Sequence, residues 1–410
     1  MAGLYIHIPF CKSRCIYCGF YSTTLLSLQD RYINAVCKEM EMRPITQHPS
    51  PITQHPSPIT LYLGGGTPSQ LSAENLQKLF YNINKVYGFN FPNLHSPSLN
   101  REGWGGSSEI TIECNPDDLT IEYVAILSQL PVNRISMGAQ TFSDERLRFL
   151  HRRHTAEQVR TAVKRLRAIG IKNISIDLMF GFPGETIADW QRDIDEALAL
   201  NVEHISAYSL MYEEGTPLYE QFKHANVQKL EEETERQMFE LLIDRLEAAG
   251  YEHYEISNFA ITQHPSPNTH HPTPNTHHPS PFRSLHNSNY WNGTPYIGLG
   301  AAAHSYDGNT RSWNVSDIRQ YIEAIEHGER PFDEELLDDD TRYNDLITTA
   351  LRTREGIDLT TLSPKYHDYL LRNAQTSLDN GTLRIDNHHI HLTRKGLFVS
   401  NDVISDLIWV

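Results

Sequence analysis

Three cysteines near the start of the chain have the residue type and the spacing of a metal site. Cys11, Cys15 and Cys18 lie within eight residues. Three thiolates can hold three irons of a four-iron cluster and leave the fourth iron open, and soft sulfur donors suit such clusters. The β-branched and aromatic run from Leu4 to Ile8, which stops at Pro9, predicts a strand. That strand would deliver the three thiols to one end of a sheet.

A zinc site, a disulfide and simple buried thiols are the alternatives. Structural zinc sites use four ligands, usually as two pairs, and only His7, inside the predicted strand, lies nearby. A disulfide needs an oxidising compartment, and no feature of the sequence points to one. The two remaining cysteines, Cys37 and Cys114, fall in a predicted helix and at a strand end, so we expect them to be structural.

Length and charge narrow the class of protein. The chain has 410 residues, which is enough for roughly two or three domains, and its formal net charge is −16. A strongly acidic chain is a poor binder of nucleic acid or anionic membranes. No apolar run reaches the roughly 18 residues of a membrane span, and a strand from residue 4 leaves no room for a signal sequence. We expect a cytoplasmic protein without a nucleic-acid partner.

Three low-complexity segments interrupt the chain. The heptapeptide Ile-Thr-Gln-His-Pro-Ser-Pro occurs twice within 45–58, and it returns with two variants within 261–281. Each copy carries two prolines, which cost about 3 kcal/mol each inside a helix. A third segment, 92–108, is rich in Gly, Ser and Asn. We predict that all three are solvated surface insertions.

Between the insertions, strand and helix patterns alternate. Strands are predicted at 4–8, 59–63, 110–114, 134–137, 174–178 and 204–210. Helices are predicted at 27–42, 73–87, 144–150, 156–169 and 188–200. This alternation indicates a parallel sheet with right-handed crossovers. Chemistry on such a sheet belongs at the carboxyl ends of the strands.

Candidate ligand-binding residues follow several of these strands. The segment Gly64-Gly-Gly-Thr-Pro-Ser69 would let the backbone approach a ligand, and its amides could bind a polar group. Glu113 ends the third strand, and Gln140 and Arg152 follow the fourth. Asp177 lies among apolar residues of the fifth strand, where an acid without a partner is costly. A turn, a cap or a salt bridge is the structural alternative at the glycines and at Glu113.

Over nearly its whole length the chain resembles the radical S-adenosylmethionine (radical SAM) superfamily, within its coproporphyrinogen dehydrogenase-like group. The resemblance rests on the cysteine spacing and the Gly-Gly-Gly-Thr-Pro segment. It implies a partial (βα)6 barrel with a 4Fe–4S cluster on Cys11, Cys15 and Cys18, whose open iron is chelated by the amine and carboxylate of SAM. It also implies SAM contacts by Tyr5, Tyr17, Gly65, Gly66, Thr67, Glu113, Gln140, Arg152 and Asp177.

A second motif follows the insertion 261–281. His286-Asn-Ser-Asn-Tyr-Trp291 places an imidazole and two aromatic residues on a predicted loop. A packed turn would explain them, but imidazole is also a common axial heme ligand. The segment resembles the heme-binding motif of the HemW-type heme chaperones, which implies that His286, Tyr290 and Trp291 contact heme. The same resemblance places Ile297 and His304 near the cofactor pocket.

The resemblance leaves two functions. A heme chaperone would hold heme and pass it to an acceptor, for example a respiratory hemoprotein, as a monomer or a heme-dependent dimer. An oxygen-independent coproporphyrinogen III dehydrogenase would instead use a 5′-deoxyadenosyl radical to decarboxylate propionates. Dehydrogenases of this kind carry a further cysteine where this chain has Phe20, and a longer N-terminal extension. The sequence therefore favours the chaperone, which need not be an enzyme.

The tail has its own pattern. Helices are predicted at 341–352 and 363–378, followed by a hairpin and a last helix. This order indicates a winged-helix-like α+β module, and its lack of strong basic charge favours a lid or partner-docking role over DNA binding. The expected organisation is a barrel over 1–260, the insertion 261–281, a heme-motif segment over 282–335 that completes the core, and a module over 336–410.

Overall fold

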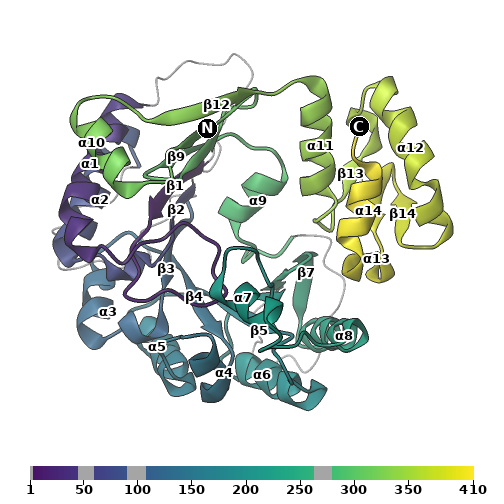
Figure 1. Ribbon diagram of the computed structural model, residues 1–410, viewed down its shortest axis with the longest axis horizontal. Helices are drawn as coiled ribbons and strands as arrows, with labels where there is room; N and C mark the ends of the chain where they lie inside the picture. Colours follow the sequence, from purple (N-terminus) through teal and green to yellow (C-terminus); the bar gives the residue numbers. More distant parts are fainter. Residues whose placement is uncertain (1–2, 45–59, 90–107, 263–278) are drawn as a thin grey trace.

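A twelve-stranded sheet organises the computed structural model, which describes residues 3–44, 60–89, 108–262 and 279–410 (Figure 1). Most of the three predicted insertions therefore lies outside the described residues. Six consecutive strands pair in parallel in chain order: β1 (Gly3–Ile8), β2 (Thr60–Gly65), β3 (Ile110–Cys114), β4 (Arg134–Gln140), β5 (Asn173–Phe180) and β6 (His204–Ser209). The predicted parallel α/β barrel is confirmed.

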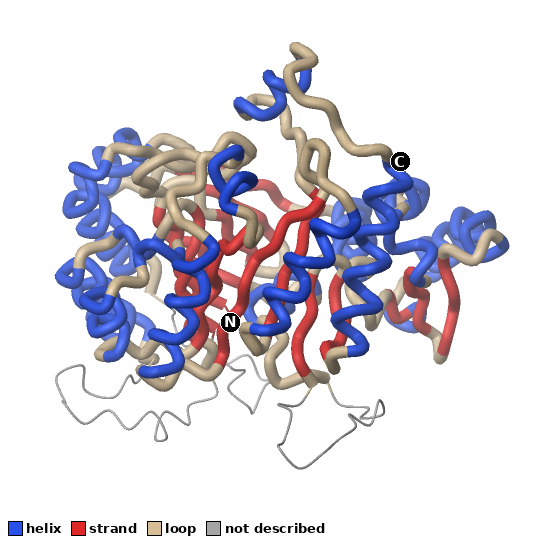
Figure 2. The backbone as a smooth tube through the Cα atoms, turned by 90° about the horizontal axis from the view of Figure 1, so that it is seen from below, coloured by secondary structure: helices blue, strands red, loops and turns tan. Residues whose placement is uncertain are grey.

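Helices cover the outer face of these strands (Figure 2). They are α1 (Gln29–Met42), α2 (Ala73–Tyr87), α3 (Ile121–Ser128), α4 (Asp144–Phe149), α5 (Ala156–Ala168) and α6 (Ile187–Ala199). Helix α2 shows how the sequence sets their limits. Ser72 accepts a hydrogen bond from the amide of Asn75, and Gly88 ends the helix in the left-handed conformation. Leu76 and Phe80, one turn apart, are fully buried between helix and sheet.

Side chains alternate along each strand between an apolar outer face and a polar inner face. In β1, Leu4, Ile6 and Ile8 belong to the apolar core, whereas Tyr5 and His7 are hydrogen-bonded to each other. The other parallel strands repeat this period of two. On their inner faces lie Thr60 and Tyr62, Thr111 and Glu113, Arg134 and Ser136, Ser175 and Asp177, and His204 and Ser206. The barrel therefore encloses a polar interior.

Antiparallel strands extend the sheet at both edges. After α7 (Pro217–Lys223) and α8 (Glu232–Ala248), the hairpin of β7 (Tyr251–Glu255) and β8 (Asn258–Ile261) joins β6. On the other side β9 (Tyr296–Leu299) pairs in parallel with β1, and β10 (His304–Tyr306), β11 (Thr310–Asn314) and β12 (Phe332–Leu336) follow around α10 (Ile318–Glu326). Acidic side chains on exposed β12 protect that edge from further pairing.

The C-terminal residues form a separate apolar core with a three-stranded sheet. Its elements are α11 (Asp339–Ala350), β13 (Ile357–Asp358), α12 (Pro364–Asp379), β14 (Leu383–Asp386), β15 (His389–Leu392), α13 (Arg394–Phe398) and α14 (Ser400–Leu407). The predicted hairpin and helices of the tail are confirmed.

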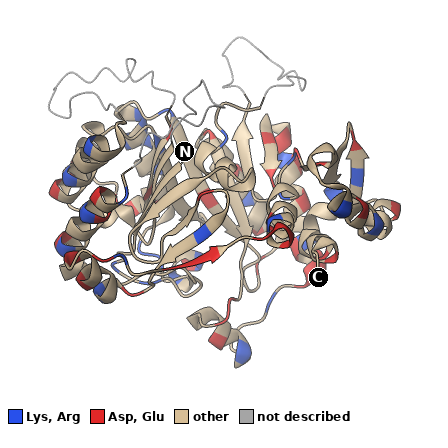
Figure 3. Ribbon diagram, turned by 90° about the horizontal axis from the view of Figure 1, so that it is seen from above, with Lys and Arg blue, Asp and Glu red and all other residues tan. Residues whose placement is uncertain are grey.

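Acidic and basic residues are interspersed along the outer helices (Figure 3). Every helix in the described residues is too short or too polar to cross a bilayer.

Candidate functional site

The cysteine loop follows β1 and is closed by backbone hydrogen bonds. The amide of Cys11 donates to the carbonyl oxygen of Thr23 (2.9 Å), whose own amide donates to that of Pro9 (2.7 Å). Cys11, Cys15 and Cys18 are all partly buried free thiols. Because the loop follows β1 in a parallel sheet, it lies at the carboxyl end of the strands, where the sequence predicts it.

Two polar groups approach the thiols. Nη1 of Arg152 lies 3.6 Å from Sγ of Cys15, and Oγ1 of Thr67 lies 3.3 Å from Sγ of Cys11. Burial raises the pKa of the Cys11 and Cys18 thiols, so a bound cation is needed to hold them as thiolates near neutral pH. A guanidinium beside one sulfur offsets the negative charge of a thiolate-bound cluster. These residues fit a 4Fe–4S cluster held by three thiolates.

The zinc alternative has no preformed site in the described part of the chain. There, no three His, Cys, Asp or Glu side chains converge closely enough to hold a single metal ion. His7, the nearby candidate for a fourth ligand, bonds instead to the hydroxyl of Tyr5 (3.0 Å) and the carbonyl oxygen of Tyr21 (3.0 Å). A cluster binds each thiolate through a different iron, so it does not require convergence on one point.

Glu113 ends β3 and is held by two donors. The hydroxyl of Tyr62 donates to Oε1 (2.8 Å), and the amide of Gly65 donates to Oε2 (2.9 Å). Burial, and then the nearby carboxyl group of Asp177, raise the pKa of Glu113 to about 7. A ligand ammonium group would lower that pKa again, because an opposite charge favours the ionised form.

Crowding within the protein requires the glycines at the end of β2 and directly after it. A Cβ atom on Gly65, which has a φ of +112°, would lie 2.4 Å from the ring of His7. A Cβ atom on Gly66 would lie 2.7 Å from the backbone of Pro9. Both glycine amides are hydrogen-bonded inside the protein, that of Gly65 to Glu113 and that of Gly66 to a β1 carbonyl oxygen. Both amides are thus used within the protein, where they position Glu113 and the turn.

Gln140 lies at an irregularity in the pairing of β4 with β5 and has a φ of +66°. Left-handed backbone in a residue other than glycine costs energy and concentrates at functional sites. Arg152 donates to the carbonyl oxygen of Gly138 (2.7 Å) and to Oδ1 of Asn115 (2.8 Å). Asn115, which the sequence analysis missed, therefore fixes Arg152 beside the cluster thiols. Its place directly after a predicted strand was the available signal.

Asp177 lies on the polar inner face of β5. Burial raises the pKa of its carboxyl group to about 6, while the positive charges of Arg134 and Arg152 oppose that rise. Tyr17 packs beside a small apolar cluster under the cysteine loop, and burial raises the pKa of its phenol.

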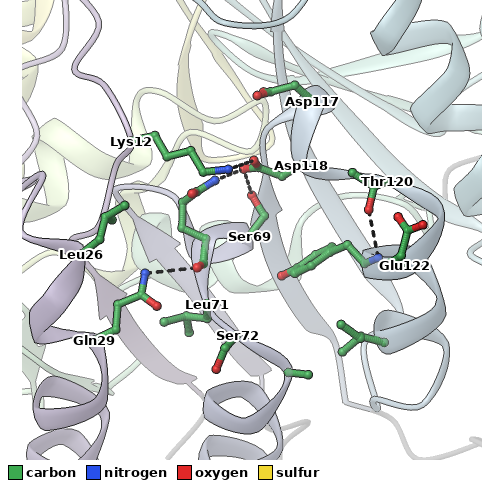
Figure 4. A pocket seen from close by; sticks show the side chains of 14 residues that line it. Lys12, Leu26, Gln29, Ser69, Leu71, Ser72, Asp117, Asp118, Thr120 and Glu122 are labelled. Carbon is green, nitrogen blue, oxygen red and sulfur yellow. Dashed lines mark hydrogen bonds and ion pairs between the residues drawn. The ribbon is translucent and has the colours of Figure 1, made fainter.

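A cavity of about 500 Å³ lies beside the cysteine loop (Figure 4). The carboxylate of Asp118 accepts hydrogen bonds from the hydroxyl of Ser69 (2.7 Å) and the amide of Gln70, and Nζ of Lys12 lies 3.6 Å away. None of the predicted site residues lines this cavity. The hydrogen bonds of Asp118 to Ser69 and Gln70 fix the turn that follows Thr67. Asp118 is therefore a positioning residue, and the sequence analysis missed it.

His286 lies at the opposite end of the barrel, on α9 (Leu285–Trp291) rather than on the predicted loop. Its Nδ1 is 2.8 Å from Oγ1 of Thr60 at the start of β2, and its amide donates to Oε1 of Glu109 (3.0 Å), just before β3. A strand of six residues spans about 17 Å, which sets the scale of the separation from the cysteine loop. The ring is 1% exposed, and burial, aided by Arg134, lowers its pKa to about 3.

The two aromatic residues of the motif have different surroundings. The hydroxyl of Tyr290 is 2.8 Å from Nε2 of His286. The guanidinium carbon of Arg352 lies over the ring of Trp291, 5.2 Å from the ring centroid. This contact joins α9 to the C-terminal module. The structure thus brings His286 and Tyr290 into direct contact and turns Trp291 toward another partner.

The remaining two predicted residues lie on the sheet extension. Ile297 pairs with Leu4 between β9 and β1. His304 is exposed on β10, where its ring stacks on Trp313 with centroids 5.9 Å apart.

Comparison with known proteins places the chain in a family. Residues 5–197 match the Radical SAM superfamily, and residues 337–399 match the HemN C-terminal domain. The chain is 35% identical to the Bacillus subtilis protein named heme chaperone HemW, over 98% of each chain. It is 31% identical to the Lactococcus lactis protein of the same name, over 98% of this chain and 96% of the relative.

A solved structure shares the fold. Coproporphyrinogen III oxidase (HemN) from Escherichia coli superimposes with a TM-score of 0.75 over 99% of this chain and 90% of its own, at 20% sequence identity. The chain belongs to the HemW family of the radical SAM superfamily, which implies a 4Fe–4S cluster and SAM as its cofactors.

Proposed function

We propose that the protein is a heme chaperone that binds heme through His286 and passes it to an acceptor protein. The observation that carries this proposal is the similarity to proteins named heme chaperone HemW along nearly the whole chain. The short helix α9 adds an imidazole and two aromatic residues of the types that bind heme.

The cofactors belong at the other end of the barrel. Cys11, Cys15 and Cys18 would hold the cluster, with Arg152 beside the sulfur of Cys15. The bound cluster would present its open iron to the SAM amine and carboxylate. The carboxylate of Glu113, which two protein donors hold in place, would accept a hydrogen bond from an amine or hydroxyl group of SAM. Further SAM contacts are assigned to Tyr5, Tyr17, Gly65, Gly66, Thr67, Gln140 and Asp177.

The alternative is an oxygen-independent coproporphyrinogen III dehydrogenase. The likeness to the Escherichia coli enzyme is one of fold. On the cysteine loop Phe20 is 72% exposed and supplies an aromatic ring where the dehydrogenases have a thiol. The chaperone is therefore the better supported function.

An anaerobic hemin titration of the cluster-reconstituted chain, read at the Soret band, tests the proposal. Wild type should saturate at one heme per chain, and His286→Ala should raise the dissociation constant about tenfold or more, because it removes an iron–nitrogen bond. The control His327→Ala removes an exposed histidine and should titrate like wild type. Identical weak spectra in wild type and His286→Ala would contradict the proposal, and coproporphyrinogen decarboxylation would then be assayed.

A further inference from the structure

Tyr62 touches both ends of the barrel interior. Its ring stacks on the ring of His286, with centroids 5.0 Å apart and planes 24° apart. Its hydroxyl donates to Oε1 of Glu113 at 2.8 Å. The side chain lies on β2, midway between the turn at the cysteine end and Thr60 at the other end, and the residue is 8% exposed. One buried side chain therefore contacts both a proposed heme ligand and a proposed SAM contact.

His286 cannot bind iron in the position that the structure shows. A neutral imidazole has one ring nitrogen that donates and one lone pair that accepts. Nδ1 is 2.8 Å from the hydroxyl oxygen of Thr60, and Nε2 is 2.8 Å from that of Tyr290. One of the two hydroxyls therefore occupies the lone pair that iron would need. With the ring only 1% exposed, heme binding requires His286 to leave a hydroxyl partner and to move.

Movement of His286 would affect the hydrogen bonds of Glu113, because Tyr62 contacts both residues. When the imidazole leaves, the face of Tyr62 loses its stacking partner at 5.0 Å and keeps the ring of Tyr5, 6.2 Å away. Glu113 has two donors, the hydroxyl of Tyr62 and the amide of Gly65. A displaced Tyr62 would leave the carboxylate with the single donor of Gly65. Glu113 would then be less well positioned for a ligand amine.

We infer that Tyr62 is a positioning residue that couples SAM binding to heme binding. This inference rests on the proposed function. SAM bound at Glu113 holds the Tyr62 hydroxyl in place, and Tyr62 in turn holds His286 in its closed arrangement. Bound SAM therefore weakens heme binding, and bound heme weakens SAM binding by the same factor, as linkage requires. In this arrangement SAM acts as the ligand that promotes heme release.

Hemin titrations of the cluster-reconstituted full chain, with and without saturating SAM, test the coupling. In wild type, SAM should raise the hemin dissociation constant by roughly five- to tenfold, within the range of measured couplings. In Tyr62→Phe, which keeps the ring but removes the hydroxyl bond to Glu113, that ratio should fall below about twofold. Radiolabelled SAM binding with and without hemin should give the same wild-type ratio, independently of any catalytic assay.

The control is Tyr251→Phe. Tyr251 is also a buried tyrosine whose hydroxyl donates to a protein oxygen, the carbonyl of Val202, but it lies on β7 away from His286. It should keep the full ratio. Cluster content and melting temperature report whether each variant is folded. Hemin binding that depends on His286 but is unaffected by SAM, or an undiminished ratio in Tyr62→Phe, would overturn the coupling and leave the proposed function intact. Hemin binding that does not depend on His286 would overturn the proposed function itself.

Discussion

The two ends of the barrel hold their functional groups in opposite states. At the carboxyl end, Cys11, Cys15 and Cys18 are free and partly exposed, and Arg152 already lies beside one of the sulfurs. At the other end, His286 is almost completely buried and both of its ring nitrogens are bonded to hydroxyls. A ligand at the first end meets prepared groups, whereas a ligand at the second must displace protein contacts. The comparison indicates that the cysteine end can take a cluster without breaking these contacts, whereas heme binding at His286 would require a rearrangement.

At both ends of the barrel, burial shifts the pKa values of ionisable side chains toward their uncharged forms. It raises the pKa of Glu113 to about 7 and of Asp177 to about 6, and it lowers that of His286 to about 3. Each shift favours the uncharged form, because a low-dielectric interior penalises charge of either sign. A ligand group of opposite charge would therefore stabilise the ionised form of each of these three residues.

The largest effect is expected at the prepared end. Cys15→Ala should abolish the 4Fe–4S absorption and the bound iron after anaerobic reconstitution, because two thiolates cannot replace three. Cys37→Ala removes a thiol buried in the helical layer and should retain both. Full cluster content in Cys15→Ala would show that the ligands lie elsewhere.

Burial of His286 should make the protein less stable at acidic pH. His286 has a pKa of about 3 when folded and about 6.5 when unfolded, so the unfolded chain binds more protons between these values. The contribution to stability is present above pH 6.5 and is lost as the pH falls. Between pH 7 and pH 5 it amounts to about 2 kcal/mol. Denaturant unfolding should therefore show wild type losing about 2 kcal/mol more than His286→Gln over this range. Parallel pH profiles would contradict the assignment.

Releasing one contact of the closed end should aid heme binding modestly. Tyr290→Phe keeps the aromatic ring but removes the hydroxyl that bonds to Nε2 of His286. If that bond must break before iron binds, its loss should tighten hemin binding by up to about fivefold, the equivalent of one hydrogen bond of about 1 kcal/mol. The Soret titration measures it directly. Weaker binding in the variant would mean that the hydroxyl contacts the bound heme instead.

The sequence predicted the first end better than the second. The cysteine loop and the residues at strand ends are local signals, since the parallel strands bring their carboxyl ends together whatever the loops do. The parallel strands were accordingly predicted close to their observed limits, as were the outer helices except α3, which was not predicted. The limits of β3 and α2 were predicted as observed. The alternation of Tyr5, His7, Thr60 and Tyr62 also indicates a polar inner face, which the sequence analysis did not predict.

Long-range contacts could not be predicted in the same way. The bonds of His286 to Thr60 and of α9 to Glu109 join residues more than 170 positions apart. No local pattern states that a histidine after an insertion will be buried under the start of β2. The antiparallel extension of β10 to β12 was missed for the same reason, because its pairing depends on the parallel contact of β9 with β1.

The smallest effect is expected from the insertion next to α9. Its two flanks are joined by described contacts: Oγ of Ser280 donates to the carbonyl oxygen of Ile261 (2.6 Å), and the amide of Ser280 donates to Glu252 (2.9 Å). Since the flanks already lie side by side, replacing residues 263–278 with a short Gly-Ser linker should not strain α9. Hemin affinity should stay within about twofold of wild type in the Soret titration. A tenfold change in either direction would show that this segment, and not only Thr60 and Tyr290, controls access to His286.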